Sequence, residues 1–435
     1  MITMSLYQLV DAFWLGKLGY QAIAALTVVM PYFVFVIAMG VGSGVGANAL
    51  ASRRFGEGNV EATNQVAGQV FLLAGLLGTL TMIAAVFFAE PILTICGATP
   101  DIMGLATQYL VVLGYGTPFF IFRMITGNLF RASGDAVRPM VFAIVGTVVN
   151  VILDPFLIFG WGPFPEMGVS GAALATVIAS VLSAALSFYY FIGRKSVYRL
   201  KLSHLIPSLP IIRDIYRVGF PSMLMQMMES VVFALFNYVL SGFGSVALAA
   251  VGIIGRIMDL AFMPMVGVHQ GLLPIVGFCF GARLWDRLWH AVKLASVVLV
   301  VTTGLATVVL EIFAPQTIAI FNDDAKLLAI GIPAMRIFMA TLIFIGPEWM
   351  VITTFQGLSK GKEALILTLL RQFFFVPPLF LLPRVMGITG VWLSWPISDF
   401  LAFIASGFWI LREYKVQKRS DYWLTASIAE ADPKD

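Results

Sequence analysis

Two stretches of this sequence decide the fold, LGYQAIAALTVVM at residues 18–30 and FGSVALAAVGIIG at residues 243–255. They resemble each other and lie 225 residues apart, since 243 − 18 = 225. At the same spacing, three glycines of the first half meet three of the second: Gly42, Gly46 and Gly56 with Gly267, Gly271 and Gly281. A further pair, MGVSGAALATVIA at 167–179 and MGITGVWLSWPIS at 386–398, follows at a slightly shorter spacing. Several anchors at near-constant spacing predict two structural repeats.

The composition places both repeats in a membrane. Of the 435 residues, 60% are hydrophobic and only 11% are charged, and the mean hydropathy is +0.93. A soluble protein carries roughly 25% charged residues. Apolar runs of about 20 residues, the length that spans a bilayer, recur from end to end. The sequence therefore predicts an all-α polytopic membrane protein.

We expect twelve transmembrane helices, six in each repeat, around a central cleft. Their expected limits are 1–16, 22–50, 63–89, 102–130, 139–160, 168–193, 214–241, 247–279, 288–313, 328–356, 364–386 and 389–411. Six helices per repeat give both halves the same orientation, with an axis along the membrane normal and a substrate site between them. The predicted parts are an N-lobe (1–193), an inter-lobe connector (194–213), a C-lobe (214–411) and a tail (412–435).

Helix 1 is shorter than its counterpart in the second repeat. Met1 corresponds to Gln226, which lies well inside helix 7. We therefore expect helix 1 to be N-terminally truncated, with a naturally short helix as the alternative.

Lysine and arginine are concentrated in the loops after even-numbered helices and in the tail, which predicts that both termini are cytoplasmic in a cell membrane. Cys96 and Cys279 are the only cysteines and the three histidines are scattered, so neither a disulfide framework nor a metal cluster is expected. We predict no cofactor beyond a coupling ion, no nucleic-acid partner and a monomer.

One predicted helix carries an acid in an apolar stretch, VVNVILDPFLIFG at residues 148–160. Asn150 and Asp154 are four residues apart, so their side chains share one helix face. A carboxylate in hydrocarbon is costly and marks a functional site by default. Pro155 frees backbone carbonyls. Carboxylate, amide and carbonyl oxygens suit Na⁺, and the same carboxylate could instead bind a proton.

The motifs identify a family. LVDAFWLGKLG at residues 9–19, FRASGD at 130–135, NVILDP at 150–155 and PIVGFCFGA at 274–282 resemble the multidrug and toxin extrusion (MATE) transporters. The resemblance covers essentially the whole chain and is to the archaeal and DinF-like branch. It implies two six-helix lobes around a cleft and export of organic cations in exchange for H⁺ or Na⁺. It also implies an ion-coupling cluster of Asp11, Asn150, Asp154 and Thr176.

The second repeat is an internal control for this cluster. The counterparts of its four polar residues are all apolar: Phe236, Phe375, Leu379 and Trp395. The fold itself therefore does not require the polar groups, which favours a coupling role. Asn and Thr are also ordinary interhelical hydrogen-bonding residues, and that alternative stays open for Asn150 and Thr176.

Other polar residues in the spans suggest a substrate cleft and a gate. Glu229 stands at the spacing of a C-lobe cation-site glutamate of the NorM-like branch, but that branch's helix 10 aspartate has no match here. Adaptable methionines around it suit varied ligands. The predicted cleft residues are Met223, Gln226, Met227 and Glu229. In the alternative, the methionines face lipid or the core and Glu229 bonds to a neighbouring helix. Arg123 and Glu348 are equivalent positions of opposite charge, and we hypothesise that they pair across the cleft on the cytoplasmic side. In the alternative, each has a partner within its own lobe.

The sequence thus predicts a secondary antiporter that exports cationic, amphipathic small molecules by alternating access. A lipid-linked oligosaccharide flippase of the same superfamily is the alternative, but it requires basic residues for pyrophosphate. The spans hold more acids than bases, which argues against it. We expect no enzyme, because no Ser–His or HExxH constellation lies in the spans.

Overall fold

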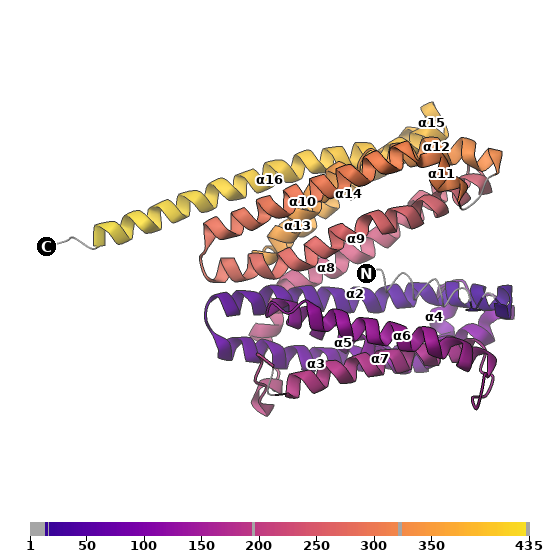
Figure 1. Ribbon diagram of the computed structural model, residues 1–435, viewed down its shortest axis with the longest axis horizontal. Coiled ribbons are helices and arrows are strands. Elements are labelled where there is room, and N and C mark those ends of the chain that lie inside the picture. Colours follow the sequence, from indigo (N-terminus) through magenta and orange to yellow (C-terminus); the bar gives the residue numbers. More distant parts are fainter. Residues whose placement is uncertain (1–13, 16, 194–195, 321–323, 432–435) are drawn as a thin grey trace. The chain divides into compact units, whose positions relative to one another are not determined.

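The structure is a computed structural model that describes residues 14–15, 17–193, 196–320 and 324–431 (Figure 1). Within these ranges every regular element is a helix. The first repeat forms α2 (Tyr20–Gly56), α3 (Val60–Phe87), α4 (Ala89–Ile95), α5 (Pro100–Ala132), α6 (Val137–Phe159) and α7 (Val169–Ile192). The second repeat forms α8 (Leu209–Ser241), α9 (Ser245–Gly281), α10 (Trp285–Ile312), α11 (Ala314–Ala319), α12 (Ala325–Met339), α13 (Leu342–Gly357), α14 (Gly361–Leu381), α15 (Pro383–Met386) and α16 (Ile388–Ala431).

The helical membrane fold predicted from the sequence is confirmed. Ten of the described helices are long and apolar enough to cross a membrane, and α12 and α13 together could form an eleventh span. The predicted first helix lies almost wholly outside the described residues, so its truncation is not addressed. Short extra helices, α4 and α11, follow α3 and α10 at equivalent places in the two repeats.

The chain forms two compact units whose limits lie inside helices. The first contains residues 1–227, 273–282 and 356–361, and the second contains 228–272, 283–355 and 362–435. These limits differ from the lobes expected from the repeat, because they follow contacts in space. The division into lobes at residues 193 and 214 stays a prediction.

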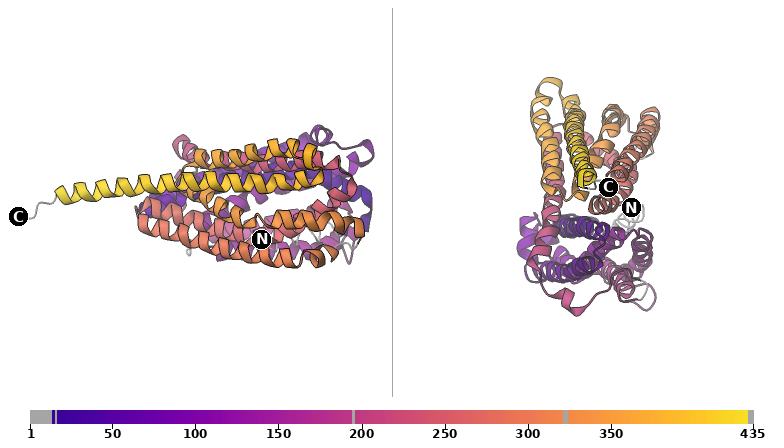
Figure 2. Two further views of the ribbon diagram at one scale, coloured as in Figure 1. Left: turned by 90° about the horizontal axis from the view of Figure 1, so that it is seen from above. Right: turned by 90° about the vertical axis from the view of Figure 1, so that its left-hand side faces the viewer.

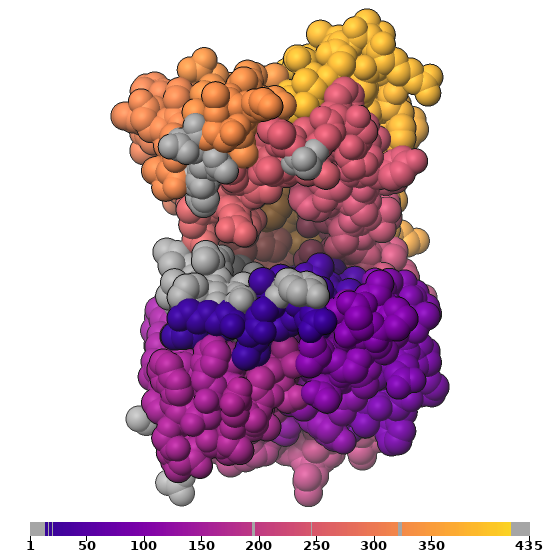
Figure 3. Space-filling view, turned by 90° about the vertical axis from the view of Figure 1, so that its right-hand side faces the viewer, coloured from indigo at the N-terminus to yellow at the C-terminus, as the bar shows by residue number. Residues whose placement is uncertain are grey.

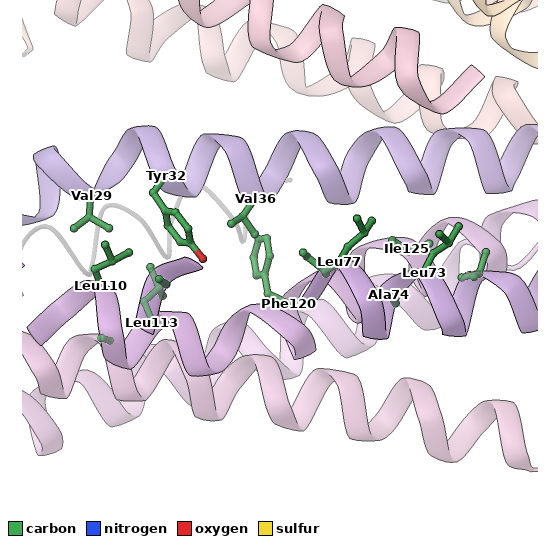
Figure 4. Packing of buried hydrophobic residues seen from close by; sticks show 14 of the residues in the cluster. Val29, Tyr32, Val36, Leu73, Ala74, Leu77, Leu110, Leu113, Phe120 and Ile125 are labelled. Carbon is green, nitrogen blue, oxygen red and sulfur yellow. The ribbon is translucent and has the colours of Figure 1, made fainter. Parts of the chain in front are cut away.

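The core of the first unit is a bundle of apolar helices in which α5 packs on α2, α3 and α7. Val29, Val36 and Leu110 are buried between these helices (Figure 4). The buried Tyr32 donates its hydroxyl proton to the Thr81 carbonyl over 2.9 Å. Figure 3 shows one face of the molecule in space-filling form, coloured from indigo at the start of the chain to yellow at its end.

The connector after α7 is bonded to α3 through backbone groups around η1 (Leu202–Leu205). The Gln69 amide donates to the carbonyls of His204 and Ile206 over 2.8 and 2.7 Å. Its carbonyl accepts the Ser208 N–H over 2.9 Å. One buried side chain therefore satisfies three backbone groups of the connector.

The span predicted at 328–356 is broken. It consists of α12 and α13, which meet at residues 340–341 with a bend of 44°. The bend itself was not predicted, because hydropathy reports apolar length and not helix direction.

The last helix is longer than the predicted span. α16 runs from Ile388 to Ala431 and extends well past the other helices of its unit (Figures 1 and 2). The Tyr414 ring packs edge-on against Trp289 of α10, with 5.0 Å between ring centroids. The first part of the predicted tail is therefore a continuation of the helix.

Candidate functional site

The polar residues predicted on α6 and α7 lie together in the first unit. Asn150, Asp154 and Thr176 are 1%, 0% and 6% exposed. The Asn150 amide nitrogen is 3.4 Å from Asp154 Oδ1 and 3.5 Å from Thr176 Oγ1. Asn150 thus bridges the carboxylate of its own helix to the hydroxyl of the next.

Glycines bring α7 close enough to α6 for this contact. A Cβ atom on Gly171 would lie 2.3 Å from the Leu157 carbonyl oxygen. A Cβ atom on Gly146 would lie 2.2 Å from Ser183 Oγ. At Gly171 the contact is with backbone, so any larger residue there would separate the two helices and move Thr176 away from Asn150.

The cluster presents oxygen ligands in an apolar environment. Thr176 Oγ1 donates to the Ala172 carbonyl over 3.2 Å, so towards Asn150 it acts as a hydrogen-bond acceptor. Within the described ranges, the Asn150 Oδ1 atom accepts no hydrogen bond. An amide oxygen, a carboxylate and a hydroxyl are ligands that a hard cation prefers, and the carboxylate alone could hold a proton. Asp11, the fourth predicted member, lies outside the described residues.

The counterparts in the second repeat also meet, but as an aromatic cluster. The Phe236 ring centroid is 6.2 Å from that of Phe375 and 5.8 Å from that of Trp395. Phe375 and Trp395 are 4.6 Å apart, and Leu379 is fully buried. The second repeat therefore fills with apolar side chains the position at which the first holds polar ones.

The four residues predicted to line the cleft differ in exposure. Met227 and Glu229 are exposed and Gln226 is half-buried on α8. Met223 is buried, and a Cβ atom on Gly42 would lie 2.2 Å from its Cγ. Met223 is thus a packing residue of the first unit in this structure.

The two predicted gate residues have contacts inside their own units. The Arg123 guanidinium lies over the Phe120 ring, 5.2 Å from its centroid. Glu348 is fully buried, and its Oε2 is 3.8 Å from Nε of Arg371 on α14. The pairing of Arg123 with Glu348 stays a prediction.

Sequence reasoning did not single out Arg371, although it joins two acids of the second unit. Its Nε donates to Asp399 Oδ1 over 2.9 Å. The guanidinium also lies over the Trp395 ring, 5.6 Å from the centroid. A lone arginine in an apolar span requires acidic partners, and Glu348 and Asp399 in neighbouring spans were the available signal.

A model of one protein family, MatE, matches residues 1–156 and 221–381, which is more than half of the chain. The chain belongs to the MatE family. Curated relatives include proteins named multidrug export protein MepA from Staphylococcus saprophyticus and Staphylococcus aureus. Each is 26% identical to this chain, and the match covers 92% of this chain and 88% of the relative.

Solved structures of MATE transporters have the same fold as this MatE chain. One, described as an outward-facing multidrug resistance MATE family transporter of the MOP superfamily, has a TM-score of 0.90 at 28% identity. It covers 96% of this chain and 94% of its own. A second, a MOP superfamily transporter from Pyrococcus furiosus, has a TM-score of 0.89 at 28% identity and covers 96% and 93%. The resemblance seen in the motifs is confirmed.

Proposed function

We propose that this MatE protein is a secondary antiporter that exports drugs and other organic cations in exchange for H⁺ or Na⁺. The relatives named as multidrug export proteins support the export role. The observation that carries the coupling role is the buried Asn150–Asp154–Thr176 cluster, which is present in one repeat and replaced by apolar side chains in the other.

Asp11 completes the ion site in this proposal. Its counterpart Phe236 contacts the counterparts of both Asn150 and Thr176. Equivalent positions in a repeat have equivalent neighbours, so Asp11 is expected beside the cluster. Trp14, three residues later in the sequence, supports this placement, because its ring centroid is 5.8 Å from that of Phe159 at the end of α6. Two carboxylates that lie close together titrate as a coupled pair.

Ion binding drives transport only if it favours a conformation that substrate does not favour. In the proposed cycle, a cation enters the Asp11–Asp154 site from outside and favours release of substrate to the outside. The lobes then rearrange by alternating access, and the ion leaves to the cytoplasm. Gln226, Met227 and Glu229 are proposed to contact the amphipathic cationic substrate, whose positive charge a carboxylate attracts.

The remaining expectations belong to the same proposal. The protein acts as a monomer in the cell membrane with both termini cytoplasmic, and its partners are small molecules and the bilayer. It needs no cofactor other than the coupling ion and catalyses no chemical conversion. The flippase alternative is not favoured, because the curated relatives described above are named for multidrug export.

The test is efflux of a fluorescent organic cation from proteoliposomes, driven separately by a proton or a sodium gradient. We expect one gradient to drive efflux by the unmodified protein and Asp154→Asn to abolish it. The matched control is Asp259→Asn, which changes an exposed acid on α9 and should retain efflux. If Asp154→Asn leaves gradient-driven efflux intact, the cluster does not couple the ion to transport. Absence of efflux under both gradients, with correctly folded protein, would overturn the antiport proposal.

A further inference from the structure

The break between α12 and α13 is stabilised by side chains. Thr307 of α10 donates its hydroxyl proton to the Met339 carbonyl over 3.0 Å. The Thr341 hydroxyl donates to the Phe338 carbonyl over 2.9 Å. A helix break leaves carbonyls without their usual partners, and here hydroxyl groups satisfy two of them. The bend can therefore persist in an apolar environment.

Glu348 lies six residues after the first residue of α13, Leu342, and is incompletely satisfied. The residue is fully buried, and in the described part of the chain neither carboxylate oxygen has a hydrogen-bond partner. The Arg371 Nε atom, at 3.8 Å, is too far for a hydrogen bond. An ionised carboxylate buried in this way is unfavourable, whereas a protonated one is tolerated.

Arg371 is already held by other groups. Its Nε donates to Asp399 of α16 over 2.9 Å, and its backbone carbonyl accepts the Ser398 hydroxyl proton over 2.7 Å. Its position relative to α16 is therefore fixed twice. Glu229 of α8 also attracts the guanidinium, so one cation serves three carboxylates.

These contacts leave α13 as the element that can adjust. An ionised Glu348 gains a hydrogen bond only by moving about 1 Å toward Arg371, to the usual donor–acceptor distance. Arg371 is anchored to α16, whereas α13 starts at a break. We propose that loss of the Glu348 proton draws α13 toward α14 and changes the α12–α13 bend, making Glu348 a charge-controlled switch of this broken helix.

The charged groups that face Glu348 are Arg371 of α14, Asp399 of α16 and Glu229 of α8. One more titratable group contacts α13: His269 Nδ1 of α9 is 2.6 Å from Thr353 Oγ1. A test of pH dependence must separate His269 from Glu348. The switch does not rest on the proposed ion site of α6 and α7, so the two can fail separately.

The test is a distance measurement by double electron–electron resonance on the full chain. Cys96 and Cys279 are replaced, and spin labels are attached at Ala329 of α12 and Ile352 of α13. We expect the distance distribution to shift between pH 5 and pH 9. Glu348→Gln, which mimics the protonated acid without changing its shape, should hold the pH 5 distribution at both values. Glu311 of α10 is a second titratable group near the bend, since its Oε2 is 3.9 Å from Nε of Arg336 on α12. Glu311→Gln and His269→Gln should both retain the shift.

Two results would overturn the switch. One is a distance distribution that does not change with pH in the unmodified protein. The other is a shift that survives Glu348→Gln or disappears in His269→Gln. Because the readout is a distance, a defect in transport does not affect its interpretation.

Discussion

Ser359 and Gly134 occupy the same left-handed backbone conformation, 225 residues apart, with φ of 59° and 85°. The first follows α13 and the second follows α5. Arg283 and Gly58, also 225 residues apart, repeat the pattern with φ of 56° and 71°. The two repeats thus share the geometry of these two turns, but at both turns only the first repeat uses glycine, which adopts positive φ without strain.

Ser359→Gly should therefore stabilise the protein by about 1 kcal/mol, because it removes the steric cost of a left-handed non-glycine residue. Thermal unfolding in detergent measures the change. The reciprocal variant Gly134→Ser is the control and should destabilise the protein by a similar amount. A Cβ atom at Gly134 meets no other atom within 4 Å, so the left-handed backbone is the only source of the cost. An unchanged midpoint in both variants would contradict the assignment of strain.

Gly171→Val should disturb the ion site without touching its polar residues. The new side chain would collide with the Leu157 carbonyl and separate α7 from α6, at a cost of about 2 kcal/mol. Thr176 would move away from Asn150, so we expect both a lower unfolding temperature and weaker gradient-driven efflux. Gly75→Ala on α3 is the matched control, because a Cβ atom there meets nothing within 4 Å. It should leave efflux unchanged.

Gln69→Leu should release the connector from α3. It removes the partners of three backbone groups, and we expect a loss of about 3 kcal/mol in unfolding free energy. Hydrogen exchange at residues 204–208 should rise more than elsewhere. The control is Gln65→Leu, an exposed glutamine on the same helix. Equal exchange in the two variants would show that the connector is held by other contacts.

Glu57 predicts a dependence of stability on pH at the end of α2. Burial raises the pKa of the Glu57 carboxyl, but hydrogen bonds and attraction from Arg54 and Arg53 outweigh burial and hold the pKa below its usual range. Because the pKa is lower in the folded state, the ionised carboxyl stabilises the folded protein at pH values above the unfolded pKa of about 4.3. This stabilisation is lost as the pH falls through the folded pKa.

Glu57→Gln should therefore cost about 0.5 kcal/mol near pH 7, typical of an ion pair close to the surface. The difference from the unmodified protein should vanish near pH 3. Unfolding midpoints across this pH range measure it. Glu90→Gln, which changes an exposed acid of α4, should show no such trend. A difference that stays constant down to pH 3 would exclude the ion pairs as its cause.

The repeat and the spans were predictable because apolar length and spacing are properties of the sequence itself. The grouping of Asn150, Asp154 and Thr176 was predictable because the family motif supplied the third residue. The bend at residues 340–341 was not, since no proline or glycine stands there and the apolar run is continuous. Its stabilising hydroxyl, Thr307, belongs to another helix, and such contacts are invisible to a local pattern.

Arg371 shows the same limit in the second unit. Pairing in three dimensions decides whether a buried charge is tolerated, and Asp399 lies 28 residues away along the chain. The sequence placed Glu348 and Asp399 in predicted spans, but it did not show which basic side chain each acid would contact. The length of α16 was missed for a different reason, because a charged, polar segment can be helical when its helix is already nucleated by a span.

The aromatic cluster of Phe236, Phe375 and Trp395 has a thermodynamic consequence for the proposed antiporter. Among the described residues, these rings fill the position in the second repeat that Asn150, Asp154 and Thr176 occupy in the first, so the proposed ion site has no polar counterpart there. An exchanger that moves one monovalent cation for another is electroneutral, so it can concentrate its solute no more steeply than the ion is itself concentrated. A second ion site of the same kind would square that limit. In the proposed antiporter, the packed rings of the second repeat would therefore limit the substrate gradient to what the ion site of the first repeat alone can drive.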